Sequence, residues 1–120
     1  MTAPDFFLAE FVVADFARSL AWYRDALGLA LVLLDEPNQF ALLRGAGRGQ
    51  LALKGGTAAP TPGGVRLHFF QPDLDAALER LAALGILPDG PPRVSSEGYR
   101  SATLHDPDGY RVYLFEWANP

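Results

Sequence analysis

The stretch that decides the fold is residues 102–117, which read ATLHDPDGYRVYLFEW. Its central Asp-Pro-Asp-Gly is a turn sequence, because proline fixes φ, glycine accepts a positive φ, and aspartate side chains bond to nearby backbone. Apolar and polar residues alternate after the turn, which is typical of a strand. Val112 and Leu114 share one face, and we expect that face to pack on a helix. The opposite face carries aromatic side chains with polar tips, which suit the wall of a cavity.

A weaker copy of this hairpin lies earlier in the chain, at residues 41–54. A shift of about 61 positions, of the kind that marks an internal repeat, aligns Leu43 with Leu104 and Leu53 with Leu114. The shift also places one turn on the other. The sequence therefore indicates a duplicated unit.

The first copy of this unit is predicted at residues 5–54. Its helix begins after Asp15, a good N-cap, and ends at Gly28, a good C-terminal residue. Its apolar stripe is formed by Phe16, Leu20, Tyr23 and Leu27. The strands are expected at residues 5–13, 29–34, 39–43 and 50–54. In the first of them the alternate residues Phe7, Ala9, Phe11 and Val13 are all apolar and should face the helix.

The second copy is predicted at residues 65–117, after a glycine- and proline-rich linker at residues 55–64. Asp73 caps its helix, which ends at Gly85. The strands are expected at residues 65–71, 99–105 and 110–117, and the proline-rich residues 88–92 interrupt the strand between. The sequence thus predicts one α+β domain over residues 1–120, in which two tandem βαβββ modules form a cup-shaped mixed sheet.

Composition excludes several classes of function. The 14 acidic and 10 basic residues give a net charge of −4, which leaves no basic surface for nucleic acid. The chain has no cysteine, so disulfides and thiolate metal sites are excluded. We read no signal peptide and no apolar run long enough to span a membrane, and therefore expect a cytoplasmic protein.

Three stretches resemble the vicinal oxygen chelate superfamily, which includes glyoxalase I, extradiol dioxygenases and the bleomycin-resistance proteins. They are residues 13–28, residues 73–85 and the sequence Asp-Pro-Asp-Gly-Tyr at residues 106–110. Together they span nearly the whole chain. The resemblance implies paired βαβββ units around a cavity, and it implies a homodimer, because chains of this length usually dimerise in the family. It is closest to the metal-free branch typified by the bleomycin-resistance proteins.

Metal-using members of that family hold a divalent ion with four side chains, one from the first and one from the last strand of each module. The motif positions assign those places here to Leu8, Ala52, Arg66 and Tyr113. Leucine and alanine have no donor atom, arginine is a permanent cation, and tyrosinate is a rare ligand. The resemblance therefore predicts a cavity without the metal of the family and without another cofactor.

Glu10 and His68 offer an alternative, because they occupy equivalent places two residues further along the first strand of each module. They could hold a divalent metal in a shifted register or act as an acid–base pair. They could equally form a satisfied polar network, in which Glu10 pairs with Arg66 or His68, because a buried unpaired carboxylate is costly. The other histidine, His105, directly precedes the turn and is expected to be solvated or to cap it.

The ten residues predicted to face the cavity combine apolar surfaces with hydrogen-bond donors, as small-molecule pockets do. They are Leu8, Glu10, Gln50, Ala52, Lys54, Arg66, His68, Arg111, Tyr113 and Phe115.

Three hypotheses of function remain open. The first is a metal-free protein that binds a small molecule, for example an antibiotic or an aromatic metabolite, by stacking it on Tyr113 and Phe115. The second is a glyoxalase-like lyase or isomerase, or a dioxygenase-like enzyme. In it Glu10 or His68 removes a proton beside a carbonyl, and Arg66 stabilises the enolate. The third is a dimeric domain whose cavity has lost its function.

Overall fold

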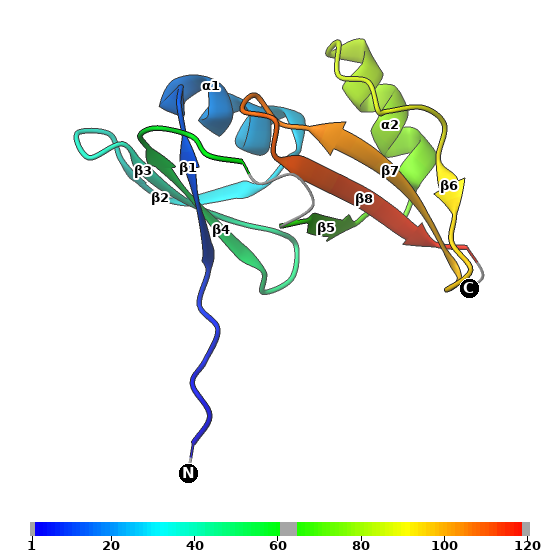
Figure 1. The fold of residues 1–120 in the computed structure, drawn as a ribbon, viewed down its shortest axis with the longest axis horizontal. Coiled ribbons are helices and arrows are strands. Elements are labelled where there is room, and N and C mark those ends of the chain that lie inside the picture. The colour runs from blue at the N-terminus through cyan, green and yellow to red at the C-terminus, as the bar shows by residue number, and fades with distance from the viewer. Residues whose placement is uncertain (1, 61–64, 119–120) are drawn as a thin grey trace. The chain divides into compact units, whose positions relative to one another are not determined.

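The structure, a computed structural model, describes residues 2–60 and 65–118. The chain divides into two compact units between residues 59 and 60, and each unit folds around its own sheet (Figure 1). Residues 61–64 of the predicted linker lie outside the described residues.

The first unit has the predicted βαβββ order. Its strands are β1 (Ala9–Val13), β2 (Ala30–Asp35), β3 (Phe40–Arg44) and β4 (Gln50–Gly55). They form a four-stranded sheet in the order β1-β4-β3-β2. β1 runs parallel to β4, and the other neighbours are antiparallel.

The helical segment of the first unit begins as predicted but changes its geometry midway. Asp15 Oδ1 accepts a hydrogen bond from Arg18 N at 3.1 Å and so caps α1 (Phe16–Ala21). The chain then widens into a π-helical turn, η1 (Trp22–Ala26), in which Leu27 N donates to Trp22 O at 2.8 Å. The prediction of one regular helix is wrong in this respect, although Gly28 follows the segment with φ +91°.

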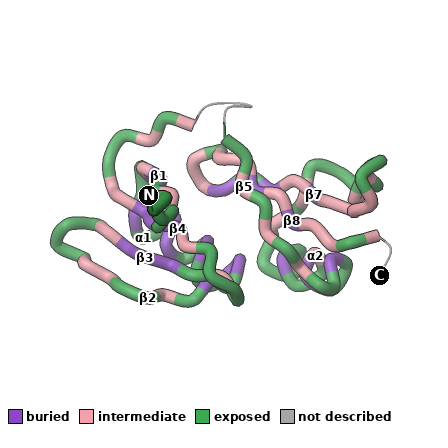
Figure 2. The backbone as a smooth tube through the Cα atoms, turned by 90° about the horizontal axis from the view of Figure 1, so that it is seen from below, coloured by how far each residue is buried: buried purple, intermediate pink, exposed green. Residues whose placement is uncertain are grey.

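The core of the first unit lies between α1 and the sheet. The four residues of the predicted helical stripe are all buried. Alternate residues of the strands meet them, namely Phe11, Val13, Ala41, Leu43, Leu51 and Leu53. Figure 2 shows the buried backbone gathered on β3 and β4. The period-two pattern thus predicts the helix-facing side of this sheet.

β1 is shorter than predicted, because it begins at Ala9 rather than at residue 5. Its partner β4 begins at Gln50, and the register pairs Ala9 with Leu51, so the residues before Ala9 extend past the start of the ladder. Phe7 is 66% exposed, and the expectation that it faces the helix is wrong.

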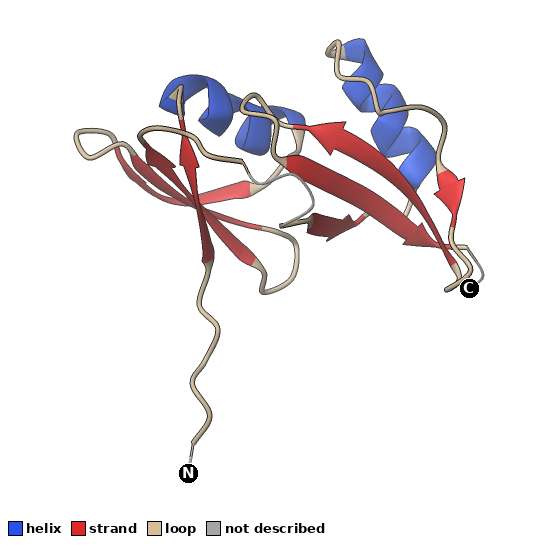
Figure 3. Cartoon of the chain, viewed as in Figure 1, coloured by secondary structure: helices blue, strands red, loops and turns tan. Residues whose placement is uncertain are grey.

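The second unit repeats the order with β5 (Leu67–Phe70), α2 (Leu74–Ala83), β6 (Arg93–Val94), β7 (Tyr99–His105) and β8 (Arg111–Trp117). Its sheet has the order β5-β8-β7-β6, with β5 and β8 parallel. β6 has only two residues, because the prolines before it lack the N–H groups that a ladder needs. The α+β class and the duplicated βαβββ order are therefore confirmed (Figure 3).

The start of α2 is held by three acidic side chains. Asp73 Oδ1 accepts from Ala76 N at 3.1 Å, and Glu116 Oε1 on β8 accepts from Leu74 N at 2.7 Å. Arg100 forms ion pairs with Asp75 at 3.1 Å and with Glu116 at 2.9 Å. Hydrogen bonds to these two carboxylates, Asp75 first, raise the pKa of the Arg100 guanidinium above its ordinary value. The network therefore joins the helix to two strands.

α2 is also the longest helix among the described residues, with ten residues. No helix in that part of the chain combines the length and the apolar character needed to cross a bilayer.

Candidate functional site

Five of the predicted site residues belong to the first unit, where the sheet face turned away from α1 carries both apolar and polar side chains. Glu10 on β1 lies opposite Ala52 on β4, which lies opposite Leu42 on β3. Ala52 and Leu42 are buried, whereas Glu10 is exposed. Leu8, just before β1, is half-buried. This stretch of the sheet offers apolar contact and one solvated carboxylate.

The two predicted donors of this unit are engaged in local contacts. Gln50 Nε2 donates to the carbonyl oxygen of Phe7 at 2.8 Å, and Gln50 Oε1 accepts from Arg44 at 2.8 Å. The Lys54 ammonium donates to the carbonyl oxygen of Asn38. Gln50 thus links β4 to β3 and to the segment before β1, and Lys54 links β4 to the turn between β2 and β3.

The other five predicted residues belong to the second unit, where four of them lie on the sheet face turned away from α2. His68 on β5 pairs with Tyr113 on β8, and their rings stack at 4.8 Å between centroids with 11° between planes. Phe115 and Arg111 follow the same parity along β8. Arg66 directly precedes β5 and is exposed.

Aromatic rings continue this face beyond the stacked pair. The Phe115 ring lies 5.5 Å from that of Phe70, 5.4 Å from that of Trp117 and 5.9 Å from that of Tyr99. Phe70 is 52% exposed and Trp117 is 58% exposed. The rings form an open apolar surface, which we call the aromatic row: His68, Tyr113, Phe70, Phe115, Trp117 and Tyr99.

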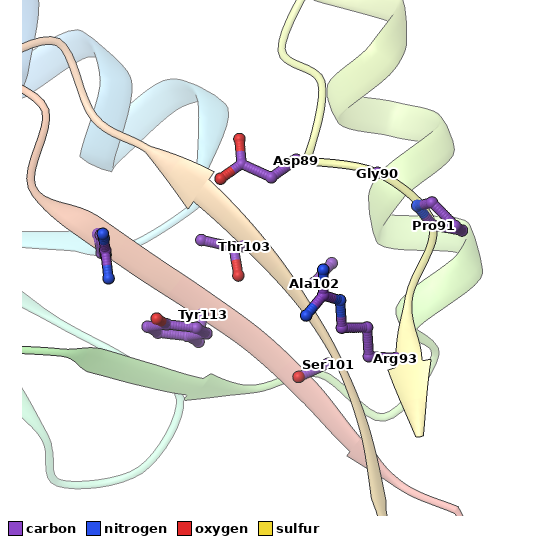
Figure 4. Close-up of a pocket in the computed structure, with 9 residues that line it drawn as sticks. Asp89, Gly90, Pro91, Arg93, Ser101, Ala102, Thr103 and Tyr113 are labelled. Atoms are coloured by element: carbon purple, nitrogen blue, oxygen red, sulfur yellow. The ribbon is translucent and has the colours of Figure 1, made fainter. Parts of the chain in front are cut away.

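A cavity of about 340 Å³ opens beside Tyr113, within the second unit. Its wall is made by β7, by β8 and by the segment that leads into β6 (Figure 4). The lining residues are Asp89, Gly90, Pro91, Arg93, Ser101, Ala102, Thr103, Arg111 and Tyr113. In Figure 4 the side chains of Thr103 and Tyr113 flank the same space from neighbouring strands.

Only Arg111 and Tyr113 of this cavity were among the predicted site residues. Ser101 and Thr103 could have been found from the sequence, because the predicted hairpin pairs β7 with β8 and places them opposite Phe115 and Tyr113. Asp89 and Arg93 gave no such signal, because Asp89 belongs to the irregular proline-rich segment and Arg93 to the two-residue strand β6 directly after it.

The charged side chains of the cavity wall differ in whether they have a partner of opposite charge. Asp89 Oδ2 lies 2.7 Å from His105 Nε2, and Asp89 N donates to the carbonyl oxygen of Thr103 at 3.0 Å. Among the described residues, neither Arg93 nor Arg111 has an ion-pair partner. His105, which the sequence predicted to be solvated or to cap the turn, is exposed and also contacts Asp89 in the wall of the cavity.

Glu10 and His68 lie in different units, so a contact between them stays a prediction. The premise that Glu10 needs a partner because it is buried is wrong, because its side chain is exposed within its own unit. His68 stacks on Tyr113, which gives it a packing role independent of Glu10.

The residues at the four family metal positions do not fit a divalent ion. Leu8 and the buried Ala52 carry no donor atom, and Arg66 is a cation. The Tyr113 ring stacks on His68. Within either unit, no three His, Asp or Glu side chains of the described residues gather as metal ligands would.

Comparison with known proteins identifies a matching family and several solved structures with a similar fold. The sequence profile of the Glyoxalase/Bleomycin resistance protein/Dioxygenase superfamily matches residues 6–114. No curated protein gives a significant match to the sequence.

Several solved structures are similar over nearly their whole length. TnmS3, an antibiotic binding protein from Streptomyces sp. CB03234, is 25% identical with a TM-score of 0.79, and the match covers 98% of each chain. A protein of unknown function from Agrobacterium tumefaciens is 26% identical with a TM-score of 0.78, covering 97% of this chain and 96% of that chain. A superfamily member from Sphaerobacter thermophilus, 24% identical with a TM-score of 0.76 and coverage of 95% and 98%, is similar in fold.

Proposed function

The chain belongs to the glyoxalase/bleomycin resistance protein/dioxygenase superfamily, and from this premise we propose that it binds a small planar molecule without a metal. The observation that carries the proposal is the aromatic row beside a cavity with polar walls in the second unit. Flat exposed rings hold planar ligands at a small cost in conformational entropy, and the polar wall supplies orientation. The proposal places the protein in the metal-free branch of the superfamily.

Two further points support binding rather than turnover. Sequestration needs affinity alone, so it does not depend on metal ligands at the four family positions. TnmS3, which is similar over 98% of the chain, is an antibiotic binding protein. We therefore propose a ligand of the antibiotic or aromatic-metabolite kind, and a homodimer as the working form.

Tryptophan fluorescence tests this proposal, because Trp117 belongs to the row. We expect planar aromatic compounds, including polycyclic antibiotics, to quench it in a saturable manner. Phe115→Ala should weaken the binding about tenfold, which corresponds to about 1.4 kcal/mol. Phe6→Ala, at an 80% exposed phenylalanine before β1, is the matched control and should bind as the parent does. Equal affinity in the two variants would contradict the proposal.

Metal content separates this proposal from the enzymatic alternative. We expect less than about a tenth of an equivalent of Mn, Fe, Co, Ni or Zn, since strong sites need several matched ligands. A full equivalent that is lost in Glu10→Ala and in His68→Ala would favour a lyase, isomerase or dioxygenase instead. Loss of a metal-free activity in Glu10→Gln would favour an acid–base enzyme.

A further inference from the structure

We infer that the cavity beside Tyr113 binds the carboxylate of an aromatic ligand, so that the molecule bound is a planar aromatic acid. This inference rests on the proposed function and adds the charge and the orientation of the ligand. The ring would lie on the aromatic row, and the acid group would point between Arg93 and Arg111.

The cavity carries an excess of positive charge. Arg93 and Arg111 contribute two guanidinium groups to its wall, and neither has an ion-pair partner among the described residues. The carboxylate of the wall, Asp89, is already engaged with His105 at 2.7 Å. Because the whole chain has a net charge of −4, this local excess is a property of the site and not of the protein surface in general.

The two arginines approach the cavity from different strands. Arg93 pairs with Ser101 across β6 and β7, and Arg111 pairs with His105 across β7 and β8. Between these pairs Thr103 lies opposite Tyr113, so hydroxyl-bearing side chains from both strands line the same space. Guanidinium and hydroxyl donors around one space match an oxyanion, since a carboxylate offers only acceptors.

Tyr113 joins the cavity to the aromatic row. Its ring stacks on His68, while its side chain also lines the cavity. A ligand whose ring continues this stack therefore brings its substituent to the arginines. The volume of about 340 Å³ lies at the lower end of ligand pockets, which fits one small acid.

The test compares three aromatic acids, benzoate, 2-naphthoate and anthracene-2-carboxylate, with their own carboxamides. Each acid and amide share shape and ring but differ in charge. Isothermal titration of the full chain at low salt should give a Kd for the best acid that is about tenfold lower than for its amide, since a charge-assisted hydrogen bond is about twice as strong as a neutral one. The preference should shrink as salt is added, because salt screens the charge.

Variants then locate the acid group. Arg93→Met and Arg111→Met should each remove most of the preference for the acid while amide binding stays. Arg111→Lys should retain part of it, because the charge remains without the planar fork. Arg48→Met removes an exposed arginine in the β3–β4 turn of the first unit and is the matched control. Far-UV circular dichroism verifies that each variant is folded.

The outcomes distinguish failure of the inference from failure of the proposed function. If acids and amides bind equally, or if both arginine variants keep the preference, the inference is overturned and the binding function stands. If neither acids nor amides bind, both the inference and the proposed function fail. Acid preference that is lost in both arginine variants and kept in Arg48→Met supports the inference.

Discussion

Glu116 connects three elements through one carboxylate. Its Oε1 accepts from the first N–H of α2 at 2.7 Å, and its Oε2 accepts from Arg100 at 2.9 Å. The side chain of Glu116 is only 19% exposed. A partly buried carboxylate at a helix N-terminus is stabilised by the backbone N–H groups and by the helix dipole.

We predict that Glu116→Ala lowers the free energy of unfolding by about 1–2 kcal/mol, because a helix cap and a partly buried ion pair are lost together. Glu116→Gln keeps an acceptor for Leu74 N and should cost less. Urea unfolding measures both variants. Glu79→Ala, at an exposed position of α2, is the control, and a loss no larger than that of the control would contradict the role of Glu116.

Single residues were predictable from sequence where their partners are close along the chain. Asp15 and Asp73 cap their helices through residues three positions ahead, and both caps were predicted. Glu116 and its partner Leu74 are 42 positions apart, and the strand parity of Glu116 showed only that it faces away from the predicted site. The same holds for Arg93, whose place in the cavity depends on its register with β7.

The turn between β7 and β8 is the element that organises the second hairpin. Asp106 is 5% exposed, and its Oδ1 accepts from Asp108 N at 3.0 Å and from Tyr110 N at 2.8 Å. Gly109 has φ +92°, and a Cβ atom added there would meet no other atom within 4 Å. Strain in the backbone, and not a clash, is therefore what a side chain there would cause.

We predict that Gly109→Ala lowers the free energy of unfolding by about 1 kcal/mol, because alanine disfavours a positive φ. Gly47→Ala in the β3–β4 turn is the matched control, since it also has open space but no positive φ. It should leave stability unchanged or raise it slightly, because alanine reduces the freedom of the unfolded chain. Thermal unfolding compares the two, and equal losses would contradict the argument.

Elements were predicted well in kind and order, and less well at their ends. The π-helical turn at Trp22–Ala26 escaped prediction, because its side chains keep a helical spacing and no glycine or proline marks it. The start of β1 was placed too early, because the apolar residues 6–8 extend beyond the point where β4 supplies a partner. The sequence pattern reports side-chain character, whereas a strand also needs a neighbouring strand.

At the scale of the whole molecule, the duplicated order and the assignment to a superfamily followed from the sequence, because they rest on motifs spread along the chain. Only part of the wall of the cavity in the second unit was predicted. Tyr113 and Arg111 follow from parity along β8. Asp89 and Arg93 belong to the proline-rich segment and to the two-residue β6, which have no periodicity to read.

We predict a homodimer, with a mass twice that of the 13.0 kDa chain. Within its unit each sheet ends in two edge strands, β1 and β2 in one and β5 and β6 in the other. Edge strands present unpaired backbone groups that favour association. Light scattering on a sizing column at micromolar concentration measures the mass, and a monomer there would contradict the prediction.

The pairing of first and last strands within each unit also bears on how the chain acquires its structure during translation. Every strand of the first sheet comes from residues 9–55, and every strand of the second from residues 67–117. The first sheet can therefore close once β4 has left the ribosome, because it needs no strand from the second unit, in keeping with the general tendency of N-terminal parts to fold first. Because each unit supplies all the strands of its own sheet, the apolar strands of the first unit can be buried during translation without any strand of the second unit.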